Sequence, residues 1–149
     1  MTDSISKLFV RDLDRLKGEI EKYTNEEDLW IIEGDILNSA GNLCLHICGN
    51  LQHFVGAVMG NTGYERDRPY EFSAKNIPRE QLLEEVDKTK AIVTEVVGNL
   101  SAEQLASTFP INIWNFEMTT EYFLIHLYSH VTWHLGHINY HRRILAASK

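Results

Sequence analysis

The stretch of residues 119–147 constrains the fold more than any other part of the sequence. It contains one glycine, Gly136, and no proline, and its apolar side chains recur at helical spacing. Glycine and proline are the residues that most strongly interrupt helices. The stretch therefore predicts a single helix, the longest in the chain.

Three other stretches show the apolar periodicity of amphipathic helices. They cover about residues 5–23, residues 39–59, which begin at the good N-cap Ser39, and residues 78–99, which begin at Pro78. No stretch alternates as a strand does. The sequence thus predicts an all-α chain that forms a four-helix bundle, with one domain over residues 1–149.

The connection between the second and third predicted helices is long. Gly60 to Gly63 ends the second helix, and a polar loop over residues 64–76 follows before Pro78. Its length lets the chain cross the bundle instead of making a tight hairpin. Ser101 and Gln104 have capping-box spacing, so a short helical turn is expected there. Residues 108–118 are expected to be irregular and to fold over one end of the core.

The charge balance and the apolar runs exclude several classes of protein. Fourteen Lys and Arg face 21 Asp and Glu, a net charge of −7, whereas proteins that bind nucleic acid need a concentrated basic face. No apolar run approaches the roughly 20 residues that span a bilayer, and charges interrupt the N-terminus where a signal peptide would be apolar. We expect a cytoplasmic protein with neither nucleic acid nor membrane as a partner.

Seven histidines are the most informative residues of the sequence, and five of them lie in residues 119–147. At about 100° per residue, these five share one helix face within about 80°. They are His126, His130, His134, His137 and His141. The other two, His46 and His53, fall about 20° apart on the second predicted helix. Cys44 and Cys48 fall on the opposite side and are expected to be reduced core thiols.

Histidines four residues apart on a helix can bind one metal ion together. The last predicted helix offers three such pairs, and periodicity does not choose among them: His126 with His130, His130 with His134, and His137 with His141. No ExxH motif of a di-iron bundle occurs, so a mononuclear site is favoured.

Crude packing narrows the choice of pair. If the second and last helices are antiparallel, with Gly60 level with Thr119, His46 lies between His130 and His134. His53 then lies beside His126.

Three segments resemble the DinB/YfiT-like family of candidate metalloenzymes: GNLQHF at residues 49–54, the RDR loop at 66–68 with Glu71 and Phe72, and HVTWHLGHINY at 130–140. The resemblance extends over nearly the whole chain. It implies an up-down-down-up four-helix bundle with a divalent metal on one histidine of the second helix and an HxxxH pair of the last. Position by position, it assigns His46, His130 and His134 as ligands.

One position departs from the family pattern. The residue after the family's glycine is commonly Gln, and here it is His137, which we expect to affect the surroundings of the metal and not its retention. Relatives include transferases and isomerases that use a low-molecular-weight thiol. The resemblance therefore adds such a thiol as a candidate cofactor.

Three neutral imidazoles leave a divalent ion its full charge and at least one open position. Water bound there can reach a pKa near 7, and a bound thiol loses its proton. We therefore expect a metal-dependent enzyme, a hydrolase or a thiol transferase, that acts on a small-molecule substrate. Imidazole ligands do not distinguish Zn, Ni, Mn and Fe.

Other residues near the two histidine-bearing helix faces have both a functional and a structural interpretation. His53, His126 and His137 are candidates for acid or base assistance, although filling the core or bonding a carbonyl is favoured for each. Arg66 and Arg68 could bind an anionic group, but pairing with neighbouring acids such as Glu71 is favoured. Aromatic side chains flanking the histidines are expected mainly in the core. They are Tyr122, Trp133 and Tyr140.

The alternative to an enzyme is a non-enzymatic metal-binding bundle, or a structural bundle that acts through its surface. A closed shell that also uses His53 or His126 would favour storage. Bundles of this size often pair symmetrically, so a homodimer is expected under either reading.

Overall fold

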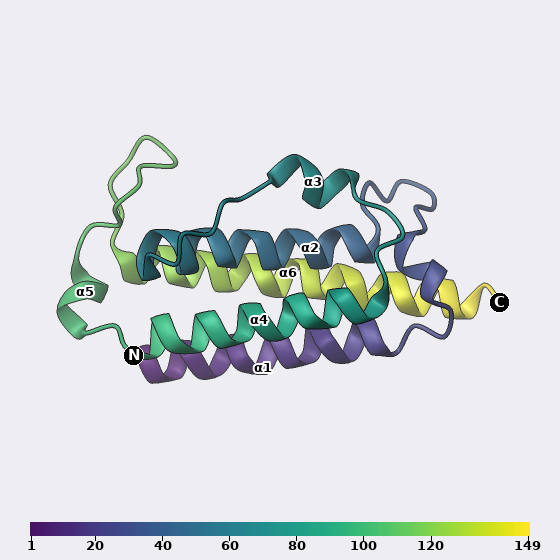
Figure 1. Cartoon of the computed structure of the whole chain (residues 1–149), viewed down its shortest axis with the longest axis horizontal. Helices are drawn as coiled ribbons and strands as arrows, with labels where there is room; N and C mark the ends of the chain where they lie inside the picture. The colour runs from purple at the N-terminus through teal and green to yellow at the C-terminus, as the bar shows by residue number, and fades with distance from the viewer.

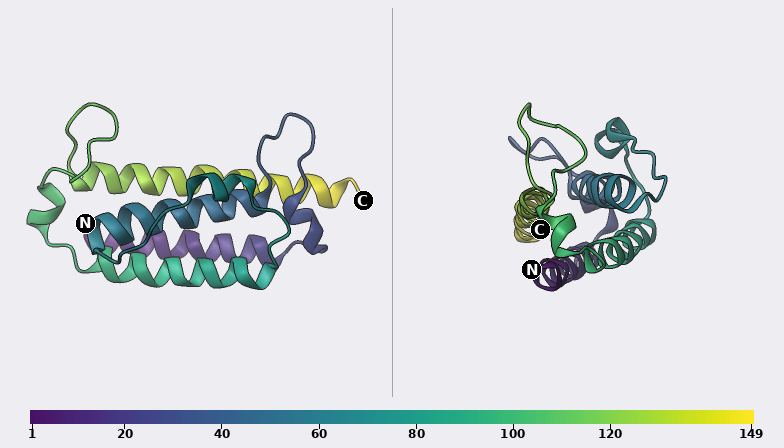
Figure 2. Two further views of the ribbon diagram at one scale, coloured as in Figure 1. Left: turned by 45° about the horizontal axis from the view of Figure 1, so that its top comes forward. Right: turned by 90° about the vertical axis from the view of Figure 1, so that its left-hand side faces the viewer.

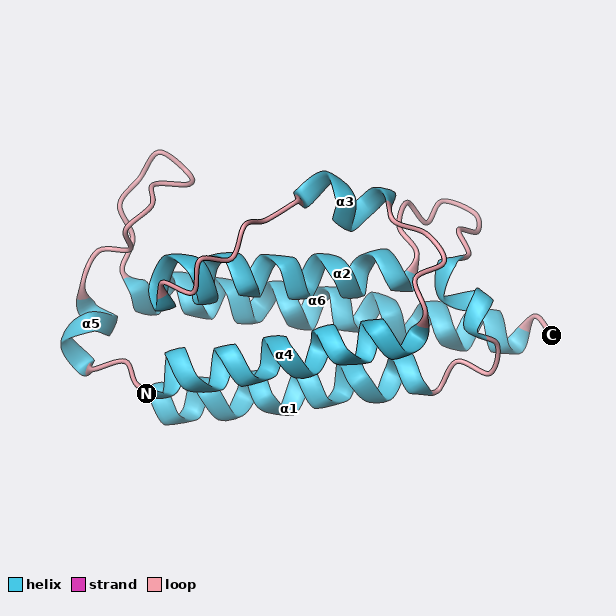
Figure 3. Cartoon of the chain, viewed as in Figure 1, coloured by secondary structure: helices cyan, strands magenta, loops and turns pink.

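The computed structural model describes all 149 residues, and its regular structure is helical (Figures 1 and 3). The long helices are α1 (Thr2–Glu21), α2 (Ala40–Leu51), α4 (Arg79–Gly98) and α6 (Thr120–Ala147). The π-helical segment η2 (Gln52–Met59) continues α2 without a break. The prediction of an all-α chain is confirmed.

Capping side chains begin three of the predicted helices at the positions that the sequence indicates. The hydroxyl groups of Ser39 and Thr119 accept hydrogen bonds from backbone N–H groups in the first turns of α2 and α6. Ser101 and Gln104 form a capping box at α5 (Ala102–Ala106). Each cap satisfies a backbone donor that the helix itself leaves unpaired.

The connections contain two short helices that the sequence does not predict. One is the 3₁₀-helix η1 (Glu26–Trp30). The other is α3 (Arg68–Ser73), whose N-cap Asp67 accepts a hydrogen bond from the Tyr70 N–H. Residues 64–76 are therefore not only a polar loop, because α3 packs on the outer side of α2 (Figure 1).

The four long helices lie side by side along the long axis of the molecule (Figures 1 and 2). α1 and α2 each contact both α4 and α6 and contact one another little, so they occupy diagonal positions. In Figure 1, α1 and α6 point to the right and α2 and α4 point to the left. The connection through α3 returns the chain from one end of α2 to the other before α4 begins.

Apolar side chains from all four helices fill the centre, among them Leu13, Ile47, Val93 and Leu127. Each such side chain contributes about 2 kcal/mol when fully buried. Cys44 is a buried free thiol in this core, as expected, and so is Cys48. No helix is both long and apolar enough to cross a membrane.

The aromatic side chains of α6 correct one expectation. Tyr122, Trp133 and Tyr140 are exposed by 54%, 67% and 65%, so they are not core residues. The buried face of α6, which includes Phe123 and Leu127, packs on α1 and α2. The three aromatic rings lie on a different face of α6 and are exposed to solvent.

Candidate metal centre

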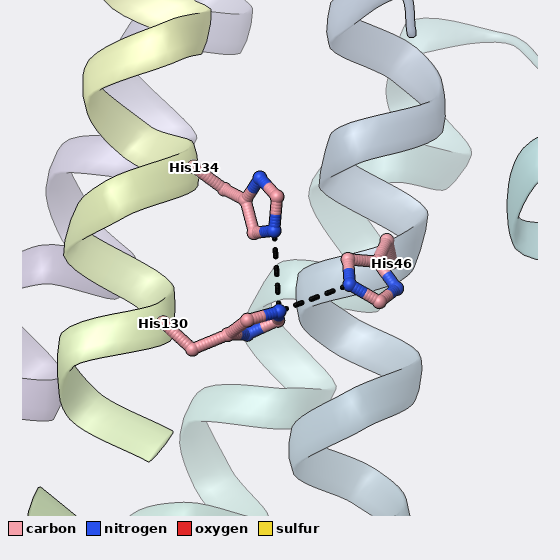
Figure 4. A group of neighbouring side chains, drawn as sticks. All are labelled: His46, His130 and His134. Atoms are coloured by element: carbon pink, nitrogen blue, oxygen red, sulfur yellow. Dashed lines mark hydrogen bonds between the residues drawn. The ribbon is translucent and has the colours of Figure 1, made fainter. Parts of the chain in front are cut away.

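Three histidine side chains from two helices converge between α2 and α6 (Figure 4). His46 projects from α2, and His130 and His134 project from successive turns of α6. The Nε2 atom of His130 lies 3.0 Å from that of His46 and 3.1 Å from that of His134. One ligand atom from each of the three residues lies within 4.8 Å of the others.

Two of the three separations among these nitrogen atoms match the spacing of ligands on one shared ion. A metal–nitrogen distance of about 2.05 Å puts two ligand nitrogens about 2.9 Å apart at a right angle and about 3.3 Å apart at a tetrahedral angle. The two Nε2 separations at His130, 3.0 and 3.1 Å, fall between these limits. The donor set therefore suits a divalent ion of the kind that imidazole binds.

Burial keeps two of these imidazoles neutral. Desolvation, aided by the neighbouring histidines, lowers the pKa of His130 to about 3 and that of His134 to about 4. Both imidazole rings are therefore neutral at neutral pH, with one nitrogen lone pair available, as a metal ligand requires. The Nδ1 atoms of both rings are buried without a hydrogen-bond partner, so no polar group orients these two rings through Nδ1.

His46, in contrast, is held by a carboxylate. Its Nδ1–H donates to Oε1 of Glu71 across 2.9 Å, which directs the lone pair of Nε2 toward His130. A carboxylate behind a metal-binding histidine fixes the tautomer and raises the basicity of the ring. Glu71 lies on α3 and is nearly fully buried.

Arg66 fixes Glu71 in turn. Its Nε and Nη2 groups donate to the two carboxylate oxygens, each at 2.8 Å. Burial acts to raise the pKa of Glu71, but the hydrogen bonds from Arg66 and His46 outweigh it and hold that pKa below its ordinary value. The carboxylate is therefore ionised at neutral pH despite its burial.

Close approach of α3 to α2 makes the contact between Glu71 and His46 possible. A Cβ atom added at Gly49 would lie 2.1 Å from Oε2 of Glu71. Asn42, two turns earlier on α2, donates through Nδ2 to the carbonyl oxygens of Glu71 and Ala74 at 3.1 and 2.8 Å. The sequence predicts Glu71 as a partner of the loop arginines but does not predict that it orients His46.

The two arginines of the loop have different environments. Arg66 pairs with Glu71, as the favoured reading predicted. No ion pair of the structure includes Arg68. Its exposed guanidinium lies 5.2 Å from the ring centroid of Phe72.

The remaining histidines lie outside the group of converging nitrogens. His53 is in η2, where the wider π-helical turn changes side-chain directions relative to an α-helix. The ring of His126 packs against Trp114, with centroids 4.5 Å apart, and burial lowers its pKa. His137 is exposed, with its ring centroid 5.8 Å from that of His134.

His141 has a structural role. Its Nδ1 lies 2.7 Å from the hydroxyl oxygen of Tyr23, and its Nε2 lies 2.9 Å from the carbonyl oxygen of Ile31. Both ring nitrogens are thus satisfied within the bundle. The pair of His137 with His141 does not converge with a third ligating group.

Two cavities adjoin the centre. One of about 260 Å³ includes His46 and His130 in its walls and extends toward Trp114. The other, of about 440 Å³, includes His134 and extends along α6 past Tyr140. A small molecule therefore has space on either side of the three histidines.

Comparisons with known proteins give a family and a fold. A family model described as a protein of unknown function, DUF1572, matches residues 3–149. A solved structure titled "Crystal structure of the conserved protein of locus from Enterococcus faecalis" superposes with a TM-score of 0.79 at 15% identity, covering 99% of this chain and 98% of that one. At that identity the likeness shows the fold alone. No curated protein matches the sequence.

Proposed function

The chain belongs to the DUF1572 family, whose function is unknown, and we propose that it is a metal-dependent enzyme that activates water or a small thiol. His46, His130 and His134 are the proposed ligands. The observation that carries the proposal is the convergence of their three Nε2 atoms beside two open cavities. Three imidazoles leave at least one position on an ion for water or substrate.

The chemistry of such a site follows from charge. A divalent ion on three neutral ligands supplies a Lewis acid that lowers the pKa of a bound water to about 7 or deprotonates a bound thiol. The chain itself contributes orientation, because Glu71 and Arg66 hold His46. His126 lies in the wall of the cavity beside His130, and burial lowers the pKa of its ring below the ordinary value.

We also propose that the fold is the up-down-down-up bundle of DinB/YfiT-like proteins, with one domain over the whole chain. The helix directions in Figure 1 and the diagonal placement of α1 and α2 support this assignment. The continuous core, which draws on all four long helices, supports a single domain.

Two copies of the chain are proposed to pair through the exposed face of α6. Between Glu121 and Arg142 the sequence of α6 contains no charged residue. Trp133 and Tyr140 are nevertheless exposed on this helix. An uncharged aromatic surface is typical of interfaces between subunits.

Cobalt spectroscopy tests the enzyme proposal against a closed metal-binding bundle. Metal-free protein is titrated with Co²⁺, whose visible absorption reports its ligands, and then with 2-mercaptoethanol. We expect one equivalent of Co²⁺ per chain and a new thiolate-to-cobalt absorption when the thiol is added. His130→Ala should lose both signals, and His137→Ala, as the matched control, should keep them. A cobalt spectrum that the thiol leaves unchanged would favour the non-enzymatic alternative.

A further inference from the structure

The smaller cavity beside the metal centre has the features of a substrate site. Its volume of about 260 Å³ lies just below the range of roughly 300–1,000 Å³ that is usual for drug-sized ligands. Its walls come from α2 and η2, the start of α6, the loop before α6 and the residues around the start of α3. It therefore suits a small molecule that reaches His46 and His130 at one end.

A polar side chain without a partner lies in this wall. Asn50, one helical turn after His46, is only 8% exposed, and its Oδ1 atom has no hydrogen-bond partner. An unpaired buried amide costs about 1–3 kcal/mol. A ligand with a hydrogen-bonding group in the cavity would remove that cost.

The charge of the cavity is positive although the chain is acidic. Its charged wall residues are Arg66 and Arg68, with no Asp or Glu among them, whereas the chain has a net charge of −7. Glu71 neutralises Arg66, but Arg68 has no carboxylate partner. In the larger cavity the one charged wall residue is Asp35. Only the smaller cavity therefore favours an anion.

Aromatic side chains complete the wall. Trp114 and Phe54 both line the cavity, and Trp114 packs its ring against that of His126. Such surfaces accept a planar apolar group, while the planar fork of an arginine matches a carboxylate.

We propose that this cavity binds a small carboxylate with an apolar, ring-sized body. The carboxylate pairs with Arg68, a polar group of the ligand hydrogen-bonds to Asn50, and the reacting end approaches His46 and His130. The reaction rests on the proposed metal-dependent function, whereas the binding does not require a metal. Carboxylate binding and metal binding can therefore be tested separately.

Binding of phenylacetate to the metal-free and the Zn²⁺-loaded protein tests the proposal. Two-dimensional NMR would follow the indole N–H of Trp114 and give the dissociation constant. We expect phenylacetate to shift this signal and its neutral amide, phenylacetamide, to bind about tenfold more weakly or worse, a loss of about 1.4 kcal/mol. Shifts centred on Tyr140 instead would overturn the placement of the ligand.

Arginine variants give a matched comparison. Arg68→Gln should weaken phenylacetate binding about tenfold, and Asn50→Ala should also weaken it. Arg143→Gln removes the same charge from an exposed arginine of α6, which lies over Tyr140, and should leave binding unchanged. Equal affinity for phenylacetate and phenylacetamide, or no effect of Arg68→Gln, would overturn the proposal.

Three further outcomes test the carboxylate assignment and keep this proposal distinct from the metal proposal. Tighter binding of phenyl phosphate than of phenylacetate would overturn the carboxylate assignment. Zn²⁺ uptake without phenylacetate binding would contradict the cavity proposal alone. Phenylacetate binding without Zn²⁺ uptake would support the cavity proposal and contradict the metal proposal.

Discussion

Glu71 is the residue on which the geometry of His46 depends. It lies 25 positions later in the chain, yet its carboxylate accepts the Nδ1–H of His46 and both donor groups of Arg66. Helical spacing relates residues on one helix, and it contains no information on where a loop returns to that helix. The sequence, together with a family resemblance, therefore predicts that the three histidines lie close together. It does not predict the carboxylate that orients one of them.

Replacing Glu71 by glutamine tests this dependence. Glu71→Gln preserves the shape of the side chain but removes the charge that fixes His46 and pairs with Arg66. We expect Zn²⁺ affinity, measured by calorimetry, to fall about 10–100-fold, as is typical when a carboxylate behind a ligand is lost. Glu65→Gln, an exposed change in the same connection, is the control. Equal affinities for the two variants would show that Glu71 does not support the metal ligand.

At the scale of elements, α6 shows what periodicity can and cannot predict. Its five histidines share one face by sequence, but the structure gives them different environments: His141 bonds within the bundle, while His137 is exposed. Helix geometry gives the direction in which each side chain points, whereas the burial of that side chain depends on where neighbouring helices cover it. The π-helical turns of η2 likewise depend on packing and have no clear signal in the sequence. The short α3 does have a local signal, because Asp67 is a good N-cap and Pro69 suits the first turn of a helix.

Buried neutral histidines on α6 predict how stability depends on pH. In the unfolded chain each histidine has a pKa of about 6.5, whereas the folded values are about 3 for His130 and about 4 for His134. Between these values the unfolded chain binds more protons, so acid favours unfolding. The free energy of unfolding of the metal-free protein should therefore decrease as the pH falls from about 6.5 to about 5.

Urea unfolding at several pH values measures this effect. A variant with both His130→Gln and His134→Gln should show a flatter dependence over that range. The single change His137→Gln, at an exposed histidine, should keep the wild-type dependence. If the double variant and the wild type lose stability equally, the two buried histidines are not the cause.

At the scale of the whole molecule, the sequence predicts the long helices well because each is long and periodic, and because capping side chains mark the starts of α2 and α6. The sequence predicts the exposed face of α6 poorly, because Trp133 and Tyr140 are residue types that are usually buried and yet they face solvent here. Aromatic side chains each bury about 150–250 Å² when covered. A surface of this kind on a helix without charges is the basis for the proposed dimer.

Analytical ultracentrifugation tests the dimer. The wild-type chain should sediment as a dimer, and Trp133→Glu should sediment as a monomer because a charge would be buried in the interface. Ile111→Glu, an exposed apolar residue in the loop before α6, should leave the dimer intact. A monomeric wild type, or a dimer that Trp133→Glu does not disturb, would exclude pairing through this face.

Metal stoichiometry tests the central claim most directly, that His46, His130 and His134 bind one divalent ion. Untagged protein is stripped with a chelator, incubated with Zn²⁺, and measured by calorimetry and elemental mass spectrometry. We predict one ion per chain in the wild type and in His53→Ala, and loss of stoichiometric binding in each of His46→Ala, His130→Ala and His134→Ala. No uptake by the wild type, or full uptake by these three variants, would contradict the claim.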